Sequence, residues 1–537
     1  MTSPSPIETA NLLTILGVIA AIWALISPTG RLRFRYCVSW LDWTFASAVF
    51  LLIHYLAFGP ALESAGLYYS LGTWKWGLDS SSVIYLLLLL VVIYFFWRTR
   101  APTLARGKLN LFRELVENLL LTQRYDELVL LVEPQLQKLI GLSTSQPLLV
   151  RLTNRLRLRS KFDLNALSSG TQRRAETAWQ RRFRASLKAA ESWLIRRNKT
   201  STQASELILD LVTSSSLVTQ LAVTHPYFHL KLLMTQEAIR SDLIDRYMDA
   251  LLAEPGSRLF VELKNSQNIR IGSRLGIPQY NRLLRFFFAD AAGAIAGGLD
   301  KAIGEAVLVR LDEDDKLAEK LNRPLGSYYE VGKFRCPINS GITLFEIMVH
   351  EGIHQGLQDH MWLHYFPYFV EKILVHMQEP GEEDAYQEWP TPFHYLLYRM
   401  VLIATEWAEQ CSRIDDAEIP KETRDAEGFD RHFISKQATM AIDSMLRCLI
   451  PSPKISSAFK EYLLGIVIRS YVSIQGDNKL ADVASSFLSS VISGSAIPTS
   501  EAYRRSLLST FEELDHVLRI KAEQFEKSLS ESLVPNT

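Results

Sequence analysis

The chain has 537 residues, which is enough for two to four domains of ordinary size. Its 58 basic residues equal its 58 acidic residues, so the overall charge indicates no class of partner, and only the distribution of charge is informative. The four cysteines are scattered and include no C-x-x-C pair, which argues against a disulfide scaffold and for a reducing compartment. Any metal site must therefore use mainly histidine and carboxylate side chains.

Three apolar stretches occur in the first hundred residues, at 10–27, 43–62 and 80–97. Each is long enough to cross about 30 Å of hydrocarbon as a helix. The first has no basic residue ahead of it and no clear cleavage site, so we expect a membrane span and not a removable signal peptide. The sequence therefore predicts a membrane domain over residues 1–107 with three transmembrane helices.

Basic residues follow the first and the third apolar stretch. They are Arg31, Arg33, Arg35, Arg98, Arg100, Arg106 and Lys108. Because positive charge is retained on the cytoplasmic side of a membrane, this pattern places the N-terminus outside and the bulk of the chain in the cytosol. The predicted location is the inner (cytoplasmic) membrane, crossed several times.

Residues 108–253 are predicted to form a helical region, in which segment 151–199 is strongly basic. So close to a transmembrane helix, such a segment is expected to lie against anionic lipid headgroups or a protein partner, with each basic residue contributing about 1 kcal/mol at a lipid surface. Nucleic acid is the rival partner, because phosphates attract the same charges. Only Trp179 and Phe183 are interleaved for base stacking, so we favour lipid or protein. A solvated helix face is the third alternative.

The sequence His350-Glu351-Gly352-Ile353-His354 lies within a run of apolar residues at helical spacing. Residues four apart on a helix lie one turn above each other, so His350 and His354 can offer two imidazoles to one metal ion. Glu351 points off that line and can act as general base on a metal-bound water. The alternative is two core histidines beside a solvated glutamate.

This H-E-x-x-H arrangement resembles the active-site helix of the zincins, which are zinc metallopeptidases. The resemblance covers this helix and a possible downstream partner helix. It implies Zn²⁺ held by His350, His354 and a third protein ligand, with Glu351 as the catalytic base.

Two residues compete for the place of third ligand. His360 has the spacing of the metzincin pattern H-E-x-x-H-x-x-G-x-x-H, but the nearby glycine is Gly356, one place early, and Leu357 stands where the pattern needs glycine. Glu406 lies in an otherwise apolar helical stretch between two alanines and resembles the glutamate ligand of the gluzincin branch. We favour Glu406. Glu409 is expected to be a surface charge paired with Arg413.

Three short runs ahead of this helix have a β-like pattern, at Arg258–Leu263, Ala306–Leu311 and Tyr328–Phe334. A small sheet before an H-E-x-x-H helix is the order of zincin catalytic domains, and there the last run would be the edge strand that pairs with substrate. The fold class expected is therefore mainly α, with a small zincin-like α+β domain over residues 254–420. Residues 421–537 are expected to form a C-terminal helical region.

The resemblance implies a membrane-anchored zinc metallopeptidase that hydrolyses a peptide or protein substrate on the cytosolic side. One rival is a non-enzymatic membrane-anchored helical scaffold. Another is a nucleic-acid-binding component of a bacterial defence or stress complex. Any of the three could work as an oligomer or as a subunit of a complex.

Overall fold

A computed structural model describes most of the chain outside the basic segment. The described residues are 34, 37–67, 80–100, 104, 106–143, 199–233, 237–266, 270–271, 274–275, 277–358, 361–379, 388–415, 417, 419, 421–425, 428–495 and 497–534. They belong to two compact units, 1–212 and 213–537, and each is described by itself. The four-part division expected from the sequence stays a prediction.

The first unit begins with a helical hairpin, formed by α3 (Trp40–Ala57) and α5 (Ser80–Arg100), with the short α4 (Gly59–Ser64) between them. Val49, Ile53 and Leu56 of α3 pack on Ile84 of α5. In the described part of the chain, α3 is the one helix long and apolar enough to cross a membrane, and segments 200–213 and 215–224 would add a second if they formed one broken span. The apolar part of α5, Ser82–Arg98, falls short of 18 residues. The predicted span at 10–27 lies outside the described residues.

A buried carboxylate joins the two helices of the hairpin at one end. Asp42, in the first turn of α3, accepts hydrogen bonds from the Tyr94 hydroxyl at 2.5 Å and the Ser39 hydroxyl at 2.7 Å. The Arg98 guanidinium lies 3.4 Å away. Because Tyr94 and Arg98 come from the end of α5, these contacts show that α3 and α5 run antiparallel.

The rest of the first unit is helical. Its elements are η1 (Arg106–Lys108), α6 (Leu109–Leu121), α7 (Tyr125–Val132), η2 (Glu133–Gln135), α8 (Leu136–Ser143) and α12 (Lys199–Thr213). Arg113 of α6 pairs with Glu117 of its own helix at 2.6 Å and with Glu206 of α12. Residues 151–198 lie outside the description, so the partners expected for the basic segment stay predictions.

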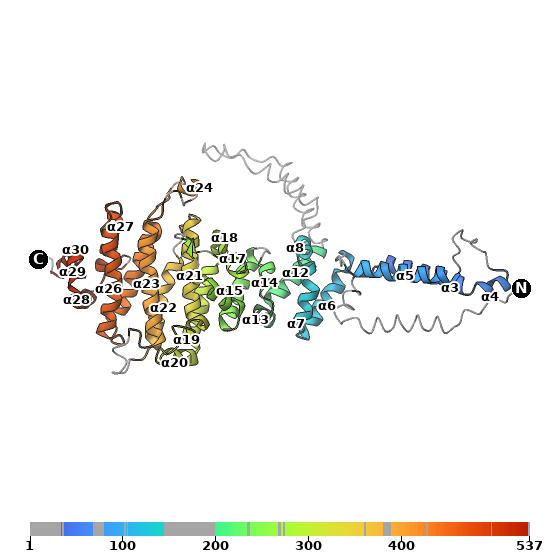
Figure 1. Cartoon of the computed structure of the whole chain (residues 1–537), viewed down its shortest axis with the longest axis horizontal. Coiled ribbons are helices and arrows are strands. Elements are labelled where there is room, and N and C mark those ends of the chain that lie inside the picture. Colours follow the sequence, from blue (N-terminus) through green and yellow to red (C-terminus); the bar gives the residue numbers. More distant parts are fainter. Residues whose placement is uncertain are drawn as a thin grey trace, which may run out of the picture. The chain divides into compact units, whose positions relative to one another are not determined.

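The second unit is a stack of helices that follow one another in space in nearly the order of the sequence (Figure 1). Its helices are α13 (Ser215–Thr224), α14 (Pro226–Leu232), α15 (Glu237–Ala253), α16 (Arg258–Ser266), α17 (Arg282–Phe288), α18 (Ala291–Ala296), α19 (Leu299–Glu313), α20 (Asp315–Leu321), η3 (Gly332–Arg335), α21 (Pro337–His354), η4 (Met361–His364), α22 (Tyr365–His376), α23 (Pro392–Ser412), α24 (Lys421–Arg424), α25 (Phe433–Leu449), α26 (Ser457–Gln475), η7 (Asn478–Leu480), α27 (Ala481–Ser493), α28 (Glu501–Glu512), α29 (His516–Lys521) and α30 (Glu523–Glu531). Helix α15 packs on α19, α19 on α21 and α22, and α21 on α23. Helix α23 in turn packs on α25 and α26.

The α+β part of the predicted fold class is wrong for the residues described, whereas the mainly α part is confirmed. The run Arg258–Leu263 lies in α16, Ala306–Leu311 lies in α19, and Tyr328–Phe334 forms turns and part of η3. The strands described are β1 (Arg270–Ile271) and β2 (Arg274–Leu275), a minimal antiparallel pair. In the first two runs helix packing overrides β-propensity, because Leu259, Phe260 and Leu263 of α16 and Ala306, Val307 and Leu311 of α19 are buried.

Two glycines let α19 approach its neighbours closely. A Cβ on Gly304 would lie 2.1 Å from the Tyr365 ring of α22, and one on Gly341 would lie 2.3 Å from the Val307 side chain. Close-packed interiors do not absorb such overlaps. These glycines therefore allow α19 to pack closely against both α22 and α21.

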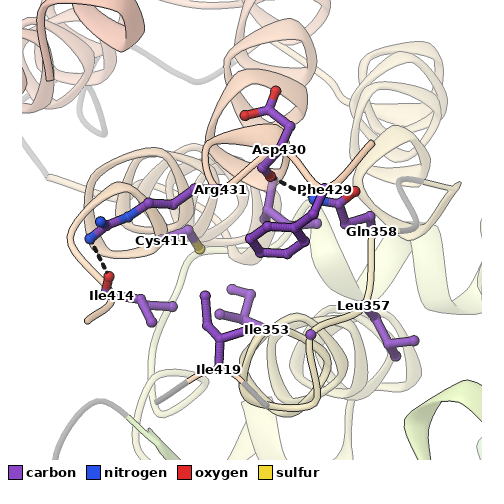
Figure 2. Close-up of a pocket in the computed structure, with 11 residues that line it drawn as sticks. Ile353, Leu357, Gln358, Cys411, Ile414, Ile419, Phe429, Asp430 and Arg431 are labelled. Carbon is purple, nitrogen blue, oxygen red and sulfur yellow. Dashed lines mark hydrogen bonds between the residues drawn. The ribbon is translucent and has the colours of Figure 1, made fainter. Parts of the chain in front are cut away.

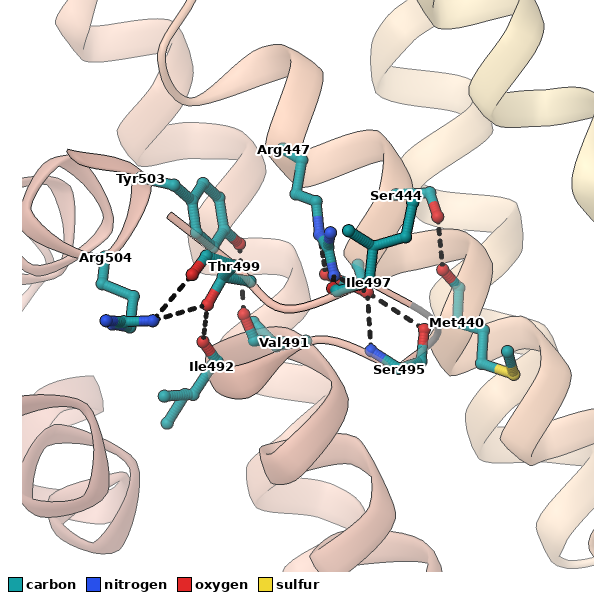
Figure 3. Close-up of polar contacts among 11 residues, drawn as sticks. Met440, Ser444, Arg447, Val491, Ile492, Ser495, Ile497, Thr499, Tyr503 and Arg504 are labelled. Carbon is teal, nitrogen blue, oxygen red and sulfur yellow. Dashed lines mark hydrogen bonds and ion pairs between the residues drawn. The ribbon is translucent and has the colours of Figure 1, made fainter. Parts of the chain in front are cut away.

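A polar network fastens the loop after α27 to α25 (Figure 3). Arg447 contacts both carboxylate oxygens of the buried Asp443, at 2.7 and 2.8 Å, and donates to the Ile497 carbonyl at 2.5 Å. Asp443 also accepts hydrogen bonds from the backbone and the hydroxyl of Ser495. The buried carboxylate is thus satisfied on all sides.

His229 of α14 is a buried titratable group outside these networks. Its exposure is 0%, it stacks on Tyr247 with ring centroids 4.8 Å apart, and neither ring nitrogen finds a hydrogen-bond partner among the residues that the structure describes. Burial lowers the pKa of His229 from 6.5 to about 3. The folded protein therefore holds this imidazole neutral.

We expect His229→Phe to reduce the acid sensitivity of the second unit. Below pH 6.5 His229 is protonated in the unfolded chain but stays neutral in the folded chain. The unfolded state is therefore favoured increasingly as the pH falls from about 6.5 toward about 3. Relative to the variant, the wild type should lose on the order of 2 kcal/mol between pH 7 and pH 5. Urea unfolding of both proteins at several pH values measures this difference. The same pH dependence of the free energy of unfolding in the wild type and the variant would contradict the prediction.

Candidate metal centre

Helix α21 carries the H-E-x-x-H residues in its last turns, as the sequence predicts. Pro337 occupies the first turn, where its missing N–H costs nothing, and the following residues are almost all buried. The side chains of His350 and Glu351 are only 6% and 3% exposed, while His354 is half-buried. The residues of the motif therefore lie at the inner edge of a core helix.

The helix ends directly after His354 in a Schellman motif. The Leu357 N–H donates to the Gly352 carbonyl at 2.9 Å, and the Gly356 N–H donates to the Ile353 carbonyl at 2.9 Å. Gly356 has φ +72°, a conformation that L side chains rarely adopt. Gly356 thus supplies the turn, and the competing ligand candidate, His360, lies outside the described residues.

Gln355 anchors this helix end to the preceding layer. Its side-chain N–H donates to the Phe288 carbonyl at 2.9 Å, and its side-chain oxygen accepts from the Ala291 N–H at 2.8 Å. These two bonds tie the end of α21 to the turn between α17 and α18. Gln355, the residue after His354, therefore fixes this end of α21 against α17 and α18.

Helix α23 carries the favoured third ligand, Glu406, and one arginine joins this helix to α21. The Nη1 of Arg399 donates to Asn339 Oδ1 at 2.5 Å and to Thr343 Oγ1 at 2.9 Å, and its Nη2 donates to Glu346 Oε2 at 2.8 Å. The three acceptors lie on successive turns of one face of α21. His350 follows Glu346 by one turn on the same face.

A small cavity lies between the C-terminal ends of α21 and α23. Ile353 of α21 and Cys411 of α23 line a space of about 20 Å³, and Figure 2 shows Ile419 and Phe429 beside it. Since Arg399 contacts the first half of α21 and Cys411 lies near its end, the two helices run in the same direction. The space is sufficient for one water molecule.

The Arg399 hydrogen bonds and the cavity lined by Ile353 and Cys411 indicate the register between α21 and α23. Glu406 lies seven residues after Arg399, on the same face of α23. With a rise of about 1.5 Å per residue, this spacing predicts that Glu406 comes level with His350. Glu406 is half-buried, as the edge of a helix interface requires.

A donor set of two imidazoles and a carboxylate is suited to zinc. In the described ranges, however, no group of three or more His, Cys, Asp or Glu side chains converges closely enough to hold a metal ion. Zinc binding by His350, His354 and Glu406 therefore stays a prediction, and so does the choice between Glu406 and His360. The expected pairing of Glu409 with Arg413 is present, at 2.9 Å.

The contacts of Arg399 are the feature that sequence reasoning missed. A signal existed, because Asn339, Thr343 and Glu346 place polar groups on one face of an otherwise apolar helix. Arg399 is likewise the one Lys or Arg residue of α23, a helix of 21 residues. Polar residues at helical spacing in two apolar helices indicate an interhelical network.

Comparison with known proteins gives no relative for this chain. No protein-family model, no curated protein and no solved structure matches it.

We expect Gly356→Ala to destabilise the end of α21 by about 2–4 kcal/mol, combining the cost of positive φ with an overlap. The added Cβ would lie 2.5 Å from the Thr423 side chain. Gly428→Ala is the matched control, because Gly428 also has positive φ, +85°, but nothing lies within 4 Å. Denaturant unfolding of both variants measures the difference, and equal losses would contradict the packing described.

Proposed function

We propose that the chain is a membrane-anchored, zinc-dependent hydrolase that cleaves peptide bonds on the cytosolic side of the membrane. The observation that carries this proposal is the placement of His350, Glu351 and His354 on the last turns of α21, a helix that packs on α23, which carries Glu406. Two imidazoles one turn apart, joined by a carboxylate from another helix, are a donor set typical of catalytic zinc. Glu351, next to the first imidazole, is the general base of such a site.

In this mechanism His350, His354 and Glu406 would hold Zn²⁺. Zinc, when bound, would supply a Lewis acid and lower the pKa of a bound water to about 7. Glu351 would accept the proton of the attacking water and later give it to the nitrogen of the leaving amine. The burial of Glu351 keeps bulk water away from the carboxylate during this transfer.

The apolar surface of the hairpin supports the membrane anchor. Trp40, Leu51 and Trp97 are among many large apolar side chains that α3 and α5 expose, with exposures of 70% or more. Soluble proteins rarely present such continuous apolar faces. The flanking arginines favour the orientation with the bulk of the chain in the cytosol, and crossing the inner membrane several times is part of the proposal.

A second candidate function, a membrane-anchored helical scaffold without catalysis, is favoured by one observation. His350 and Glu351 are almost fully buried in the helical stack, and the cavity beside Ile353 is too small for a peptide. In a scaffold, the same residues would be structural or would hold a closed metal site with four protein ligands.

Glu351→Gln separates the two functions. We expect purified wild-type protein to contain one zinc per chain and to hydrolyse peptides, and Glu351→Gln to keep the zinc but lose activity by roughly 100-fold or more. Elemental analysis and a fluorogenic peptide library measure both properties. Glu406→Gln should lose zinc, whereas Glu409→Gln, on the same helix and paired with Arg413, should keep zinc and activity.

The outcomes distinguish the proposals. Zinc in the wild type, with equal turnover in Glu351→Gln, would refute the general base. Zinc without any peptidase activity would favour the scaffold, and no zinc in the wild type would refute the metal centre.

A further inference from the structure

We infer that the end of the hairpin that carries Asp42 and Arg98 lies in a lipid headgroup layer, where Trp40, Trp43 and Trp97 form an interfacial girdle that fixes the depth of α3 and α5. The layer is the one on the side of the membrane from which the chain continues after α5. This placement rests on the membrane anchor of the proposed function and is independent of the metal centre.

The three tryptophans lie at one level of the hairpin. Trp40 and Trp43 flank Asp42 in the first turn of α3. Trp97 is adjacent to Arg98 in α5, and the Nε of Arg98 lies 3.4 Å from the Asp42 carboxylate. Because Asp42 and Arg98 are in contact, the three indoles come within about one helical turn of each other along the hairpin.

These three indoles are exposed, unlike the other tryptophans that the structure describes. Their exposures are 77%, 57% and 73%, whereas Trp362 and Trp407 of the second unit are buried and Trp389 is half-buried. An indole combines an apolar ring with an N–H donor, and tryptophan is enriched at the headgroup level of membrane proteins for this reason. Three exposed tryptophans at one level therefore indicate a boundary between hydrocarbon and water.

The charged groups at this level suit lipid headgroups. Asp42 is buried, but the side chain of Arg98 is 41% exposed, which leaves part of its guanidinium accessible to lipid phosphates. The Lys108 ammonium donates to the Val38 carbonyl just before α3, so the segment after α5 returns to the same end of the hairpin. Ionisable groups are costly at the centre of a bilayer and are tolerated at its edge.

The length of α3 and the other exposed side chains of the hairpin fit a hydrocarbon layer. Helix α3 has 18 residues and is therefore about 27 Å long, against about 30 Å of hydrocarbon. The large apolar side chains exposed between the two ends are Phe, Leu, Ile and Val, with Leu51 near the middle of α3. Tyr85, in the second turn of α5, is exposed toward the opposite end. His54, whose Nδ1 lies 2.9 Å from the Phe50 carbonyl, is also within one turn of that end of α3.

A second copy of the chain is the alternative cover for the apolar face of α5. Leu90 and Ile93 line an open hollow on this helix together with Trp97. A copy packed there would cover Trp97, but it gives no reason for the exposed Trp40 and Trp43 on α3. Lipid accounts for the tryptophans of both helices, so we commit to lipid.

Nitroxide labels measure the depth of the hairpin in vesicles of phosphatidylcholine and phosphatidylglycerol that contain the full chain. Collision with oxygen reports hydrocarbon, and collision with a water-soluble nickel complex reports water. Single cysteines replace four exposed side chains: Leu41 and Phe96 beside the tryptophans, Leu51 in the middle of α3, and Leu121 of α6. Leu121 is the matched control, because it is equally apolar and exposed but lies outside the hairpin. The native cysteines are buried or half-buried, so the unaltered chain, labelled in parallel, gives the background.

We expect the Leu51 label to lie deepest, the Leu41 and Phe96 labels to share one interfacial depth, and the Leu121 label to lie in water. A variant with leucine in place of all three tryptophans should let the Leu41 label sink into the hydrocarbon by up to about one helical turn, 5.4 Å. A variant with tyrosine at the same three positions should hold the label at its original depth, because tyrosine also favours the interface.

Each other outcome has a distinct meaning. A Leu51 label in contact with water would show that the hairpin stays outside the membrane, and the anchor of the proposed function would fail. A Leu51 label in lipid, with equally deep labels at Leu41 and Phe96, would overturn the girdle and leave the anchor intact. Low collision rates of the Phe96 label with both reagents would place a second copy on α5 in place of lipid. An unchanged depth of the Leu41 label in the leucine variant would show that the tryptophans do not fix the level.

Discussion

The relative position of α21 and α23 is the constraint on which the rest of the second unit's chemistry depends. Helix α21 carries both histidines and Glu351, and α23 carries Glu406, so no site exists unless the two helices are in the right register. The bonds from Arg399 to Asn339, Thr343 and Glu346 join the two helices at one end. Near the other end, Ile353 and Cys411 line one small cavity.

The surrounding stack limits what this part of the molecule can do. Gly304 allows α19 to approach α22, and Gly341 allows α21 to approach α19, so closely that even a methyl group would overlap with a neighbour. Gly356 ends α21 immediately after His354, and Gln355 ties that end to the layer before it. The end of α21 that carries His350 and Glu351 is therefore closely packed, and both side chains are buried.

The sequence predicted the helix around His350 and His354 correctly, because apolar residues at helical spacing are a strong local signal. It also predicted the Glu409–Arg413 pair, which depends only on spacing along one helix. It failed for the β-like runs, since Val and Leu at 306–311 pack as one face of α19 and periodicity over six residues does not separate strand from helix. The partners of Arg399 were missed, although polar residues at helical spacing indicated a network, because they lie more than 50 residues away and their identity depends on how the helices pack.

X-ray absorption at the zinc edge of the purified full chain tests the central claim most directly, because it reports the donor atoms themselves. The account predicts a first shell of nitrogen and oxygen atoms at about 2.0–2.2 Å, with the outer-shell pattern of two imidazoles and no sulfur. A shell containing sulfur at about 2.3 Å, or zinc bound without imidazole, would show that the metal lies elsewhere and would contradict the centre between α21 and α23.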